Sequence, residues 1–228
     1  MWAAILVYVL FSSLSFEFNA QINSPGATSR FSPGGQYIML TFSGGPHYYA
    51  TAKILDILKE KKVKATFFVS GSKAINHESL LKRIHQEKHE LASYGFHQQH
   101  FIKISQEKVL AGLLESSKLI SSVTNTPVKY CRAPNGYTNA EINQYIKTNT
   151  QMKVVLWSLD SHDIKEQNSL KIIDNVIKNA KPGDIVLLHD TLNQTIISLP
   201  RIIDGLYKQG YEFLTIAEVS SFPDDSPH

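Results

Sequence analysis

Short apolar runs alternate with amphipathic helical segments along most of this chain, and that alternation constrains the fold more than any other feature. The predicted strands are residues 37–42, 65–69, 90–92, 128–131, 154–157, 185–188 and 212–215. The predicted helices are residues 50–61, 78–87, 105–122, 139–147, 169–179 and 196–209. Strands that alternate with helices form parallel sheets with right-handed crossovers, so we expect an α/β fold. The number of repeats favours an irregular seven-stranded parallel (β/α) barrel over an open sheet.

The alternating region covers residues 37–219, which we predict to be a single domain. The chain has 228 residues, of which 43% are hydrophobic, enough for one sizeable core. Residues 21–36 are rich in Ser, Gly and Pro and predict an irregular lead-in, and residues 220–228 predict a polar tail. Residues 1–20 begin with an uncharged apolar run that is typical of a signal peptide. We therefore expect a secreted or cell-surface protein; the alternative is an uncleaved membrane anchor, the one case in which the protein would be membrane-bound.

The net charge argues against nucleic-acid binding, and the cysteine content argues against disulfide-stabilised and multi-cysteine zinc proteins. The formal net charge is +3, and Lys and Glu are interspersed, which argues against nucleic-acid binding. The single cysteine, Cys131, excludes an intrachain disulfide framework and a multi-cysteine zinc site, and we expect it to be a buried strand residue. If the chain is secreted, Asn193-Gln194-Thr195 is a possible glycosylation acceptor.

The chemically distinctive side chains follow directly after predicted strands. The first such strand, in the segment Tyr37–His47, breaks into a Ser-Gly-Gly-Pro turn before the next helix. The polar residues that follow strands are Ser43, His97, Arg132, Asp160, Asp163, His189 and Asp190. In a β/α barrel the carboxyl ends of the strands meet on one face, so we expect the functional site there.

Five ordered motifs identify a family. They are residues 40–47 (LTFSGGPH), 64–69 (KATFFV), 132–136 (RAPNG), 157–163 (WSLDSHD) and 187–190 (LLHD). Over residues 37–219 the chain resembles the polysaccharide deacetylases with a NodB-homology domain, carbohydrate esterase family 4. The resemblance implies a metal-dependent hydrolase, usually with zinc, that removes acetyl groups from N-acetylglucosamine polymers of the chitin or peptidoglycan type.

The resemblance also assigns roles to positions, and four of them carry the wrong residue type. Ser43 stands where the family has the aspartate general base. Its hydroxyl cannot accept a proton near neutral pH as a carboxylate does. Gly44, Tyr94 and Gln98 stand at the three metal-ligand positions, although zinc sites use imidazole, thiolate or carboxylate groups. We therefore expect no metal cofactor and no hydrolysis.

The remaining positions of the family site are kept. The resemblance implies that His189 is the general acid, that Asp163, or less favourably Asp160, orients it, and that the Asn135 backbone N–H binds the oxyanion. It also implies that Arg132 would orient the base. With no aspartate at position 43, Arg132 is either available to a ligand or paired with Asp160 or Asp163.

Aromatic residues in the post-strand loops are candidates for stacking on sugar rings. We expect Tyr137, Tyr94 and Phe101 to contact a carbohydrate. Trp157 is a further candidate for substrate binding, although its place in a strand favours the core.

A relocated metal site is the main rival interpretation. His47, His97 and His100 all lie on the presumed site face, and three histidines with a water molecule would form a catalytic zinc site. The sequence therefore leaves three hypotheses: an inactive protein that still binds N-acetylglucosamine polymers, an active de-N-acetylase with a relocated histidine site, and an interaction protein that uses the barrel only as a body.

Overall fold

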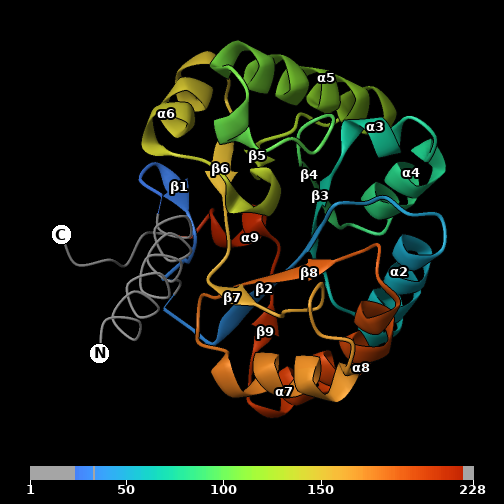
Figure 1. Ribbon diagram of the computed structural model, residues 1–228. Helices are drawn as coiled ribbons and strands as arrows, with labels where there is room; N and C mark the ends of the chain where they lie inside the picture. Colours follow the sequence, from blue (N-terminus) through green and yellow to red (C-terminus); the bar gives the residue numbers. More distant parts are fainter. Residues whose placement is uncertain (1–23, 33, 223–228) are drawn as a thin grey trace, which may run out of the picture.

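A parallel β-sheet forms the centre of the molecule, and helices surround its outer face (Figure 1). The computed structural model describes residues 24–32 and 34–222. The strands are β1 (Ala27–Thr28), β2 (Tyr37–Ser43), β3 (Thr66–Val69), β4 (Glu90–Ser93), β5 (Tyr130–Cys131), β6 (Lys153–Val155), β7 (Leu159–Asp160), β8 (Ile185–His189) and β9 (Glu212–Phe213). The helices are α2 (Ala50–Lys61), α3 (Gly71–Ala74), α4 (Glu78–Gln86), α5 (Gln106–Thr124), α6 (Ala140–Asn149), α7 (Ser169–Asn179), α8 (Asn193–Lys208) and α9 (Ile216–Val219). Two 3₁₀ turns, Phe101–Lys103 and Pro134–Gly136, lie in loops.

The α/β barrel-like fold predicted from the sequence is confirmed. The strand order is β1-β6-β5-β4-β3-β2-β8-β7, with β9 paired to β2, and all these strand pairs are parallel. Within the described residues no pairing joins β7 to β1, so the sheet is curled into a half-barrel. The sheet has two more strands than the sequence predicted, because β1 and β7 are only two residues long and carry no periodic pattern.

The lead-in, which was predicted to be irregular, takes part in the sheet. Its strand β1 pairs with β6. Two residues after β1, Arg30 forms an antiparallel bridge and a salt bridge with Asp184, and the Phe31 N–H donates to the Gly183 carbonyl at 3.0 Å. Since Gly183 and Asp184 immediately precede β8, the lead-in links the two sides of the half-barrel across its opening.

The predictions for the chain termini lie largely outside the described residues. The predicted signal peptide, residues 1–20, and most of the predicted polar tail fall in the segments 1–23 and 223–228. Of the helices in the part of the chain that is described, none combines the length and apolarity that crossing a bilayer requires.

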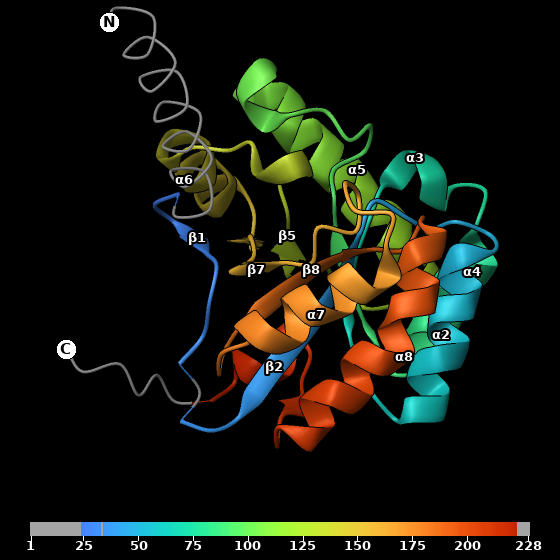
Figure 2. The ribbon, with the colours of Figure 1, turned by 60° about the horizontal axis from the view of Figure 1, so that its bottom comes forward.

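Helix boundaries follow local sequence signals. Helices α2 and α7 have the predicted bounds. The predicted N-cap Ser105 accepts a hydrogen bond from the Lys108 N–H, and Asn139 caps α6 in the same way by accepting from the Ile142 N–H at 2.9 Å. Figure 2 shows α7, α8 and α2 lying along the outside of the sheet near β2.

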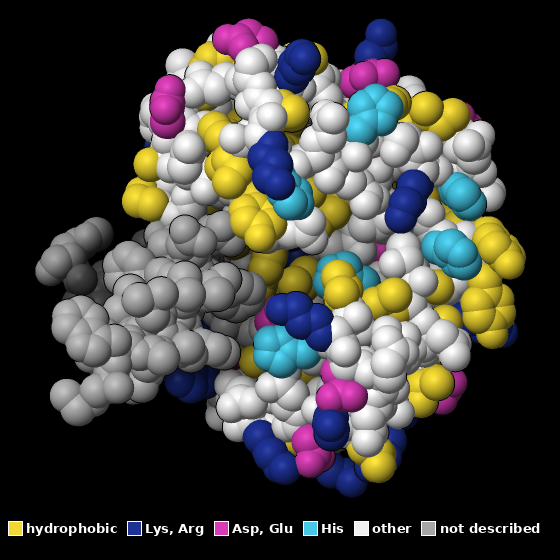
Figure 3. All heavy atoms as spheres, in the orientation of Figure 1, with side chains coloured by type: hydrophobic (Ala, Val, Ile, Leu, Met, Phe, Trp, Pro, Cys, Tyr) yellow, Lys and Arg dark blue, Asp and Glu magenta, His cyan; other side chains and the backbone are white. Residues whose placement is uncertain are grey.

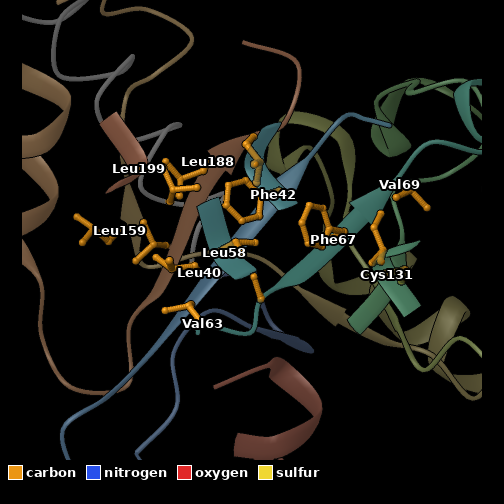
Figure 4. Packing of buried hydrophobic residues seen from close by; sticks show 14 of the residues in the cluster. Leu40, Phe42, Leu58, Val63, Phe67, Val69, Cys131, Leu159, Leu188 and Leu199 are labelled. Carbon is orange, nitrogen blue, oxygen red and sulfur yellow. The ribbon is translucent and has the colours of Figure 1, made fainter. Parts of the chain in front are cut away.

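Alternation along β2 separates the main core from the interior of the half-barrel. Ile38, Leu40 and Phe42 belong to the cluster packed under the helices, where Phe42 stacks on Phe67 with ring centroids 5.0 Å apart (Figure 4). The alternate residues of the strand point to the other side, as the two-residue period of a strand requires. Two of these, Thr41 and Ser43, are polar and fully buried.

Cys131 is a buried member of the main core, as predicted (Figure 4). Burial raises the pKa of its thiol to about 12, so the group is protonated at physiological pH and is not a nucleophile.

Candidate functional site

The predicted site residues Ser43, Arg132, Asp163 and His189 lie at or shortly after the carboxyl ends of strands. Figure 3 shows histidine, cationic and hydrophobic side chains around the middle of one face of the molecule. The alternation of β2 brings Thr41 and Ser43 to the same side of the sheet, and Arg132, which follows β5, reaches both. The floor of the site is therefore built by residues from strands that are distant in the sequence.

Arg132 is fully buried and hydrogen-bonded only to neutral oxygen atoms. Its Nη1 donates to Thr41 Oγ1 at 2.8 Å and to Ser43 Oγ at 3.1 Å. Its Nε and Nη2 donate to the carbonyls of Val155 and Leu156 at 3.0 and 2.7 Å. Within the described residues, no ion pair or hydrogen bond joins Arg132 to a carboxylate.

Both sequence-based expectations for Arg132 are therefore wrong. The guanidinium is not available to a ligand, because it is enclosed and lies 3.9 Å from the centre of the Phe68 ring. It is not paired with Asp160 or Asp163, because the curl of the sheet turns it toward β2 and β6 instead. Burial lowers the pKa of Arg132 to about 9, which leaves it charged at neutral pH.

The turn after β2 is closed by two donors that bind the same carbonyl. The Gly44 oxygen accepts from Lys73 Nζ at 2.6 Å and from Gln98 Nε2 at 2.9 Å. Two of the positions that the resemblance assigns to metal ligands, Gly44 and Gln98, are thus joined to each other directly. Gly44 has a φ of +89°, a left-handed conformation that favours glycine over aspartate.

Tyr94, at the third metal-ligand position, bonds to the loop that follows β5. Its side chain is 5% exposed, and its hydroxyl oxygen accepts a hydrogen bond from the Asn135 backbone N–H at 3.0 Å. The resemblance implies that this N–H is the oxyanion donor; in this structure it donates to the phenol. Burial raises the pKa of Tyr94, so the phenol is neutral and is a poor metal ligand.

His189 is held by Asp163, a fully buried carboxylate. The ring Nδ1 of His189 lies 2.7 Å from Asp163 Oδ1, and the backbone N–H of His189 donates to Oδ2 at 2.8 Å. Asp160 instead accepts from the His162 N–H at 2.7 Å. The structure thus pairs His189 with Asp163 rather than Asp160, while the role of His189 as an acid stays a prediction.

Two residues that sequence reasoning did not connect with the site complete the binding of Asp163. Thr195 Oγ1 donates to Asp163 Oδ2 at 2.6 Å, and Gln194 Nε2 donates to the Asp163 carbonyl at 2.7 Å. These residues belong to the Asn193-Gln194-Thr195 triplet, whose threonine is buried. The triplet therefore has a structural role at the start of α8, and its possible glycosylation stays a prediction.

Ser43 and His189 are register partners on the adjacent strands β2 and β8. No hydrogen bond between their side chains is present among the described residues, so they do not form a nucleophile–base pair. The Ser43 hydroxyl instead accepts from Arg132.

A pocket of about 320 Å³ opens beside His189. It is lined by Tyr94, His100, Asn135, Tyr137, Trp157, Asp160, His162, Ile164, Lys165, Leu187 and His189. The His100 ring stacks on Tyr137 with centroids 4.2 Å apart. Trp157 is 5% exposed, and its Nε1 has no hydrogen-bond partner in the described structure. The pocket therefore combines aromatic walls with polar groups, as carbohydrate sites do.

The structure brings some stacking candidates into this pocket and excludes one. Tyr94, Tyr137 and Trp157 line it, although Tyr94 and Trp157 are largely buried. The prediction that Phe101 stacks on a sugar is wrong, because its side chain is 3% exposed and belongs to the hydrophobic core. Its 3₁₀ turn directs the ring inward, which the loop position did not indicate.

The three histidines proposed as a relocated metal site are each placed differently. His47 Nδ1 accepts from the Ala50 N–H at the start of α2. His97 is exposed, and His100 Nε2 accepts from Asn135 Nδ2 at 2.9 Å. Across residues 24–32 and 34–222, no three His, Cys, Asp or Glu side chains form a group that could hold a metal ion.

Lys73 is a site residue that the sequence did not indicate. It belongs to the four-residue helix α3, which is too short to show a periodic pattern. Its contact with Gly44 depends on the pairing of β2 with β3 and has no local signal.

A curled parallel sheet with polar residues at its carboxyl edge defines an α/β barrel-like protein with a site at the strand ends. A family model described as polysaccharide deacetylase matches residues 32–155. The chain is 35% identical to a peptidoglycan-N-acetylglucosamine deacetylase of Bacillus cereus, over 80% of this chain and 87% of that protein. It is also 35% identical to the deacetylase PgdA of Listeria monocytogenes, but it spans only 38% of that protein's length.

Solved structures of the same class also superpose on this chain. A CE4 family pseudoenzyme from Bacillus anthracis superposes with a TM-score of 0.80 at 26% identity, covering 86% of this chain and 69% of that one. The peptidoglycan deacetylase PdaC from Bacillus subtilis superposes with a TM-score of 0.76 at 30% identity, covering 83% and 92%. The chain belongs to the polysaccharide deacetylase family.

Proposed function

We propose that this protein binds an N-acetylglucosamine-containing polymer without removing its acetyl groups. The observation that carries the proposal is the hydrogen bond from the Asn135 N–H to Tyr94 Oη. In that arrangement one side chain replaces a metal ligand and also occupies the donor that would stabilise the oxyanion of amide hydrolysis.

The residues present do not fit the divalent metal that the family uses. Gly44 offers no side chain, the neutral Tyr94 phenol accepts from a backbone N–H, and the Gln98 amide donates to Gly44. The Lys73 ammonium lies 2.6 Å from the Gly44 oxygen and would repel a second cation. No catalytic step is therefore assigned to a metal in this protein.

Proton transfer also lacks its base. The Ser43 hydroxyl accepts from the Arg132 guanidinium, and a hydroxyl beside a fixed positive charge is a still weaker base. His189 and Asp163 remain as an oriented pair. Without an activated water to attack the amide, no leaving amine forms that His189 could protonate.

The pocket supports carbohydrate binding. Its volume of about 320 Å³ is at the lower end of ligand pockets and suits a small ring, with Tyr137 and Trp157 in its walls. The relatives are named for peptidoglycan-N-acetylglucosamine and chitooligosaccharide, which supports a ligand of the same class here. Because such polymers are extracellular, the proposal agrees with the predicted signal peptide and secretion. The open pocket argues against the hypothesis that the barrel serves only as a body.

Two measurements on one purified sample test the proposal. Isothermal titration with N-acetylglucosamine oligomers should show binding, which Tyr137→Ala weakens and the exposed control Tyr207→Ala does not. Acetate release from the same oligomers should stay at the background rate, with zinc or with a chelator. Release that zinc restores and a chelator abolishes would contradict the loss of hydrolysis, and absence of binding would contradict the rest of the proposal.

A further inference from the structure

Arg132 places a positive charge at the floor of the site, and no carboxylate in residues 24–32 or 34–222 forms an ion pair with it. The side chain is 0% exposed, and its four hydrogen-bond acceptors are two hydroxyls and two carbonyls. A buried charge with only neutral partners is costly unless an opposite charge lies nearby. Two strand-end carboxyl groups are bound by other side chains, Asp163 by His189 and Asp190 by Thr51.

A space lies next to this charge. A Cβ added to Gly44 would meet no atom within 4 Å, although Gly44 itself is buried. The neighbouring Ser43 hydroxyl accepts from Arg132, so its own proton remains available to an acceptor.

Two further donor groups lie on Gly44. The Lys73 ammonium and the Gln98 amide both bind its carbonyl oxygen, and each has N–H groups beyond the one used there. The surroundings of the space are thus rich in donors and carry the charges of Lys73 and Arg132. Burial raises the pKa of Asp190, whose carboxylate approaches the turn at Gly45.

We propose that the space beside Gly44 binds the carboxylate group of a ligand. The arrangement favours an anion because the Lys73 ammonium and the Gln98 amide are bound to the Gly44 carbonyl, and the buried Arg132 guanidinium is bound to the neighbouring Ser43 hydroxyl. The carboxylate could come from a free small acid or from an acidic sugar seated in the neighbouring pocket. This inference goes beyond the proposed function and does not depend on polymer binding.

The test compares three ligands on the purified full chain at constant ionic strength. Acetate carries only the carboxylate, N-acetylglucosamine carries only the sugar, and N-acetylmuramic acid carries both. In isothermal titration we expect acetate to bind and N-acetylmuramic acid to bind about tenfold or more tightly than N-acetylglucosamine, as one charge-assisted hydrogen-bonded group would give. If N-acetylmuramic acid binds no better than N-acetylglucosamine and acetate does not bind, the inference is wrong.

Three variants connect the binding to this position. Ser43→Asp supplies an internal carboxylate to Arg132 and should abolish acetate binding. Lys73→Met, at an exposed residue, should weaken acetate binding about tenfold, whereas Lys178→Met on the far helix α7 should not. Acetate binding that survives both Ser43→Asp and Lys73→Met would overturn the assignment.

The outcomes separate the two proposals. Binding of acetate without any binding of N-acetylglucosamine oligomers would support the carboxylate site and contradict the proposed function. Binding of the oligomers without any effect of a carboxylate would support the proposed function and contradict the carboxylate site.

Discussion

The hydroxyl of Tyr94 accepts the hydrogen bond of the Asn135 N–H, and this contact shows how one residue can change both the chemistry and the stability of a site. The phenol reaches the loop that follows β5 and accepts from a donor there. The contact therefore contributes to folding.

Tyr94→Phe should destabilise the protein by about 0.5–1.5 kcal/mol, because it removes the hydrogen bond that the Asn135 N–H donates to a largely buried hydroxyl. Urea denaturation of the variant and the wild type measures the difference. Tyr48→Phe is the matched control, since Tyr48 is 72% exposed, and should change stability by no more than about 0.5 kcal/mol. An unchanged free energy of unfolding for Tyr94→Phe would show that the hydrogen bond is not formed in solution.

At the scale of elements, the first turn of α8 fixes the loop that carries Asp163. Thr195 and Gln194 both bind Asp163, while His189 at the end of β8 binds the same carboxylate from the other side. A helix start and a strand end thus share one buried anion, which fixes the orientation of the His189 ring.

Thr195→Val keeps the shape of the side chain and removes one hydrogen bond to a buried carboxylate. We expect a loss of about 1.5–3 kcal/mol in the free energy of unfolding, the usual range for bonds to charged groups. Chemical denaturation measures it, with Thr148→Val on the exposed face of α6 as the control. Equal effects of the two substitutions would argue against a role for Thr195 in holding Asp163.

Glu90, the first residue of β4, and His89 just before it have pKa values that are shifted in opposite directions. Burial raises the pKa of Glu90 to about 6, from a model-compound value of 4.5. Burial, with the charges of Lys64 and Arg83, lowers the pKa of His89 to about 4, from 6.5. Between pH 4.5 and 6 the folded state holds more protons at Glu90 and fewer at His89 than the unfolded state, so the first group lowers stability as pH rises and the second raises it.

Glu90→Gln removes the first of these two effects. The stability of the variant should therefore rise more steeply than that of the wild type as pH increases from 4.5 to 6. Denaturation at steps across this window tests the slope, and the exposed Glu115→Gln should keep the wild-type profile. A wild-type slope in Glu90→Gln would mean that Glu90 titrates normally in the folded protein.

At the scale of the whole molecule, the lead-in fastens the open side of the half-barrel. It pairs with β6 through β1 and reaches the start of β8 through Arg30 and Asp184. Asp184 is 1% exposed and also accepts from Ser158 Oγ at 2.6 Å and from the Lys181 N–H at 2.7 Å. One buried carboxylate thus joins three segments.

Asp184→Asn should cost about 1.5–3 kcal/mol, the range for hydrogen bonds to a charged group, because the carboxylate is buried while its partner Arg30 is 39% exposed. Thermal and urea unfolding both report it. Asp174→Asn removes an exposed helix pair with Lys178 and should cost no more than about 0.5 kcal/mol. A similarly small effect of Asp184→Asn would show that the lead-in is not needed to close the molecule.

Much of the architecture could be predicted from the sequence because it depends on local pattern. Periodicity of apolar residues placed the alternating strands and helices, and the bounds of α2 and α7 follow from it. The strand-end positions of Arg132, Asp163 and His189 follow from the parallel order, since carboxyl ends share an edge. Strands of two residues, such as β1 and β7, carry too few side chains to show a period.

The sequence by itself determined the order of the elements, the edge at which the site lies, and the replacement of acidic residues by Ser43 and Gly44. Only the tertiary structure decided what the remaining side chains bind. Arg132 reaches Ser43 across 89 residues, Asn135 reaches Tyr94 across 41, and Lys73 reaches Gly44 across 29. These partners are set by the curl of the sheet and by the loops that cross its edge, whereas periodicity and motifs describe only neighbours along the chain.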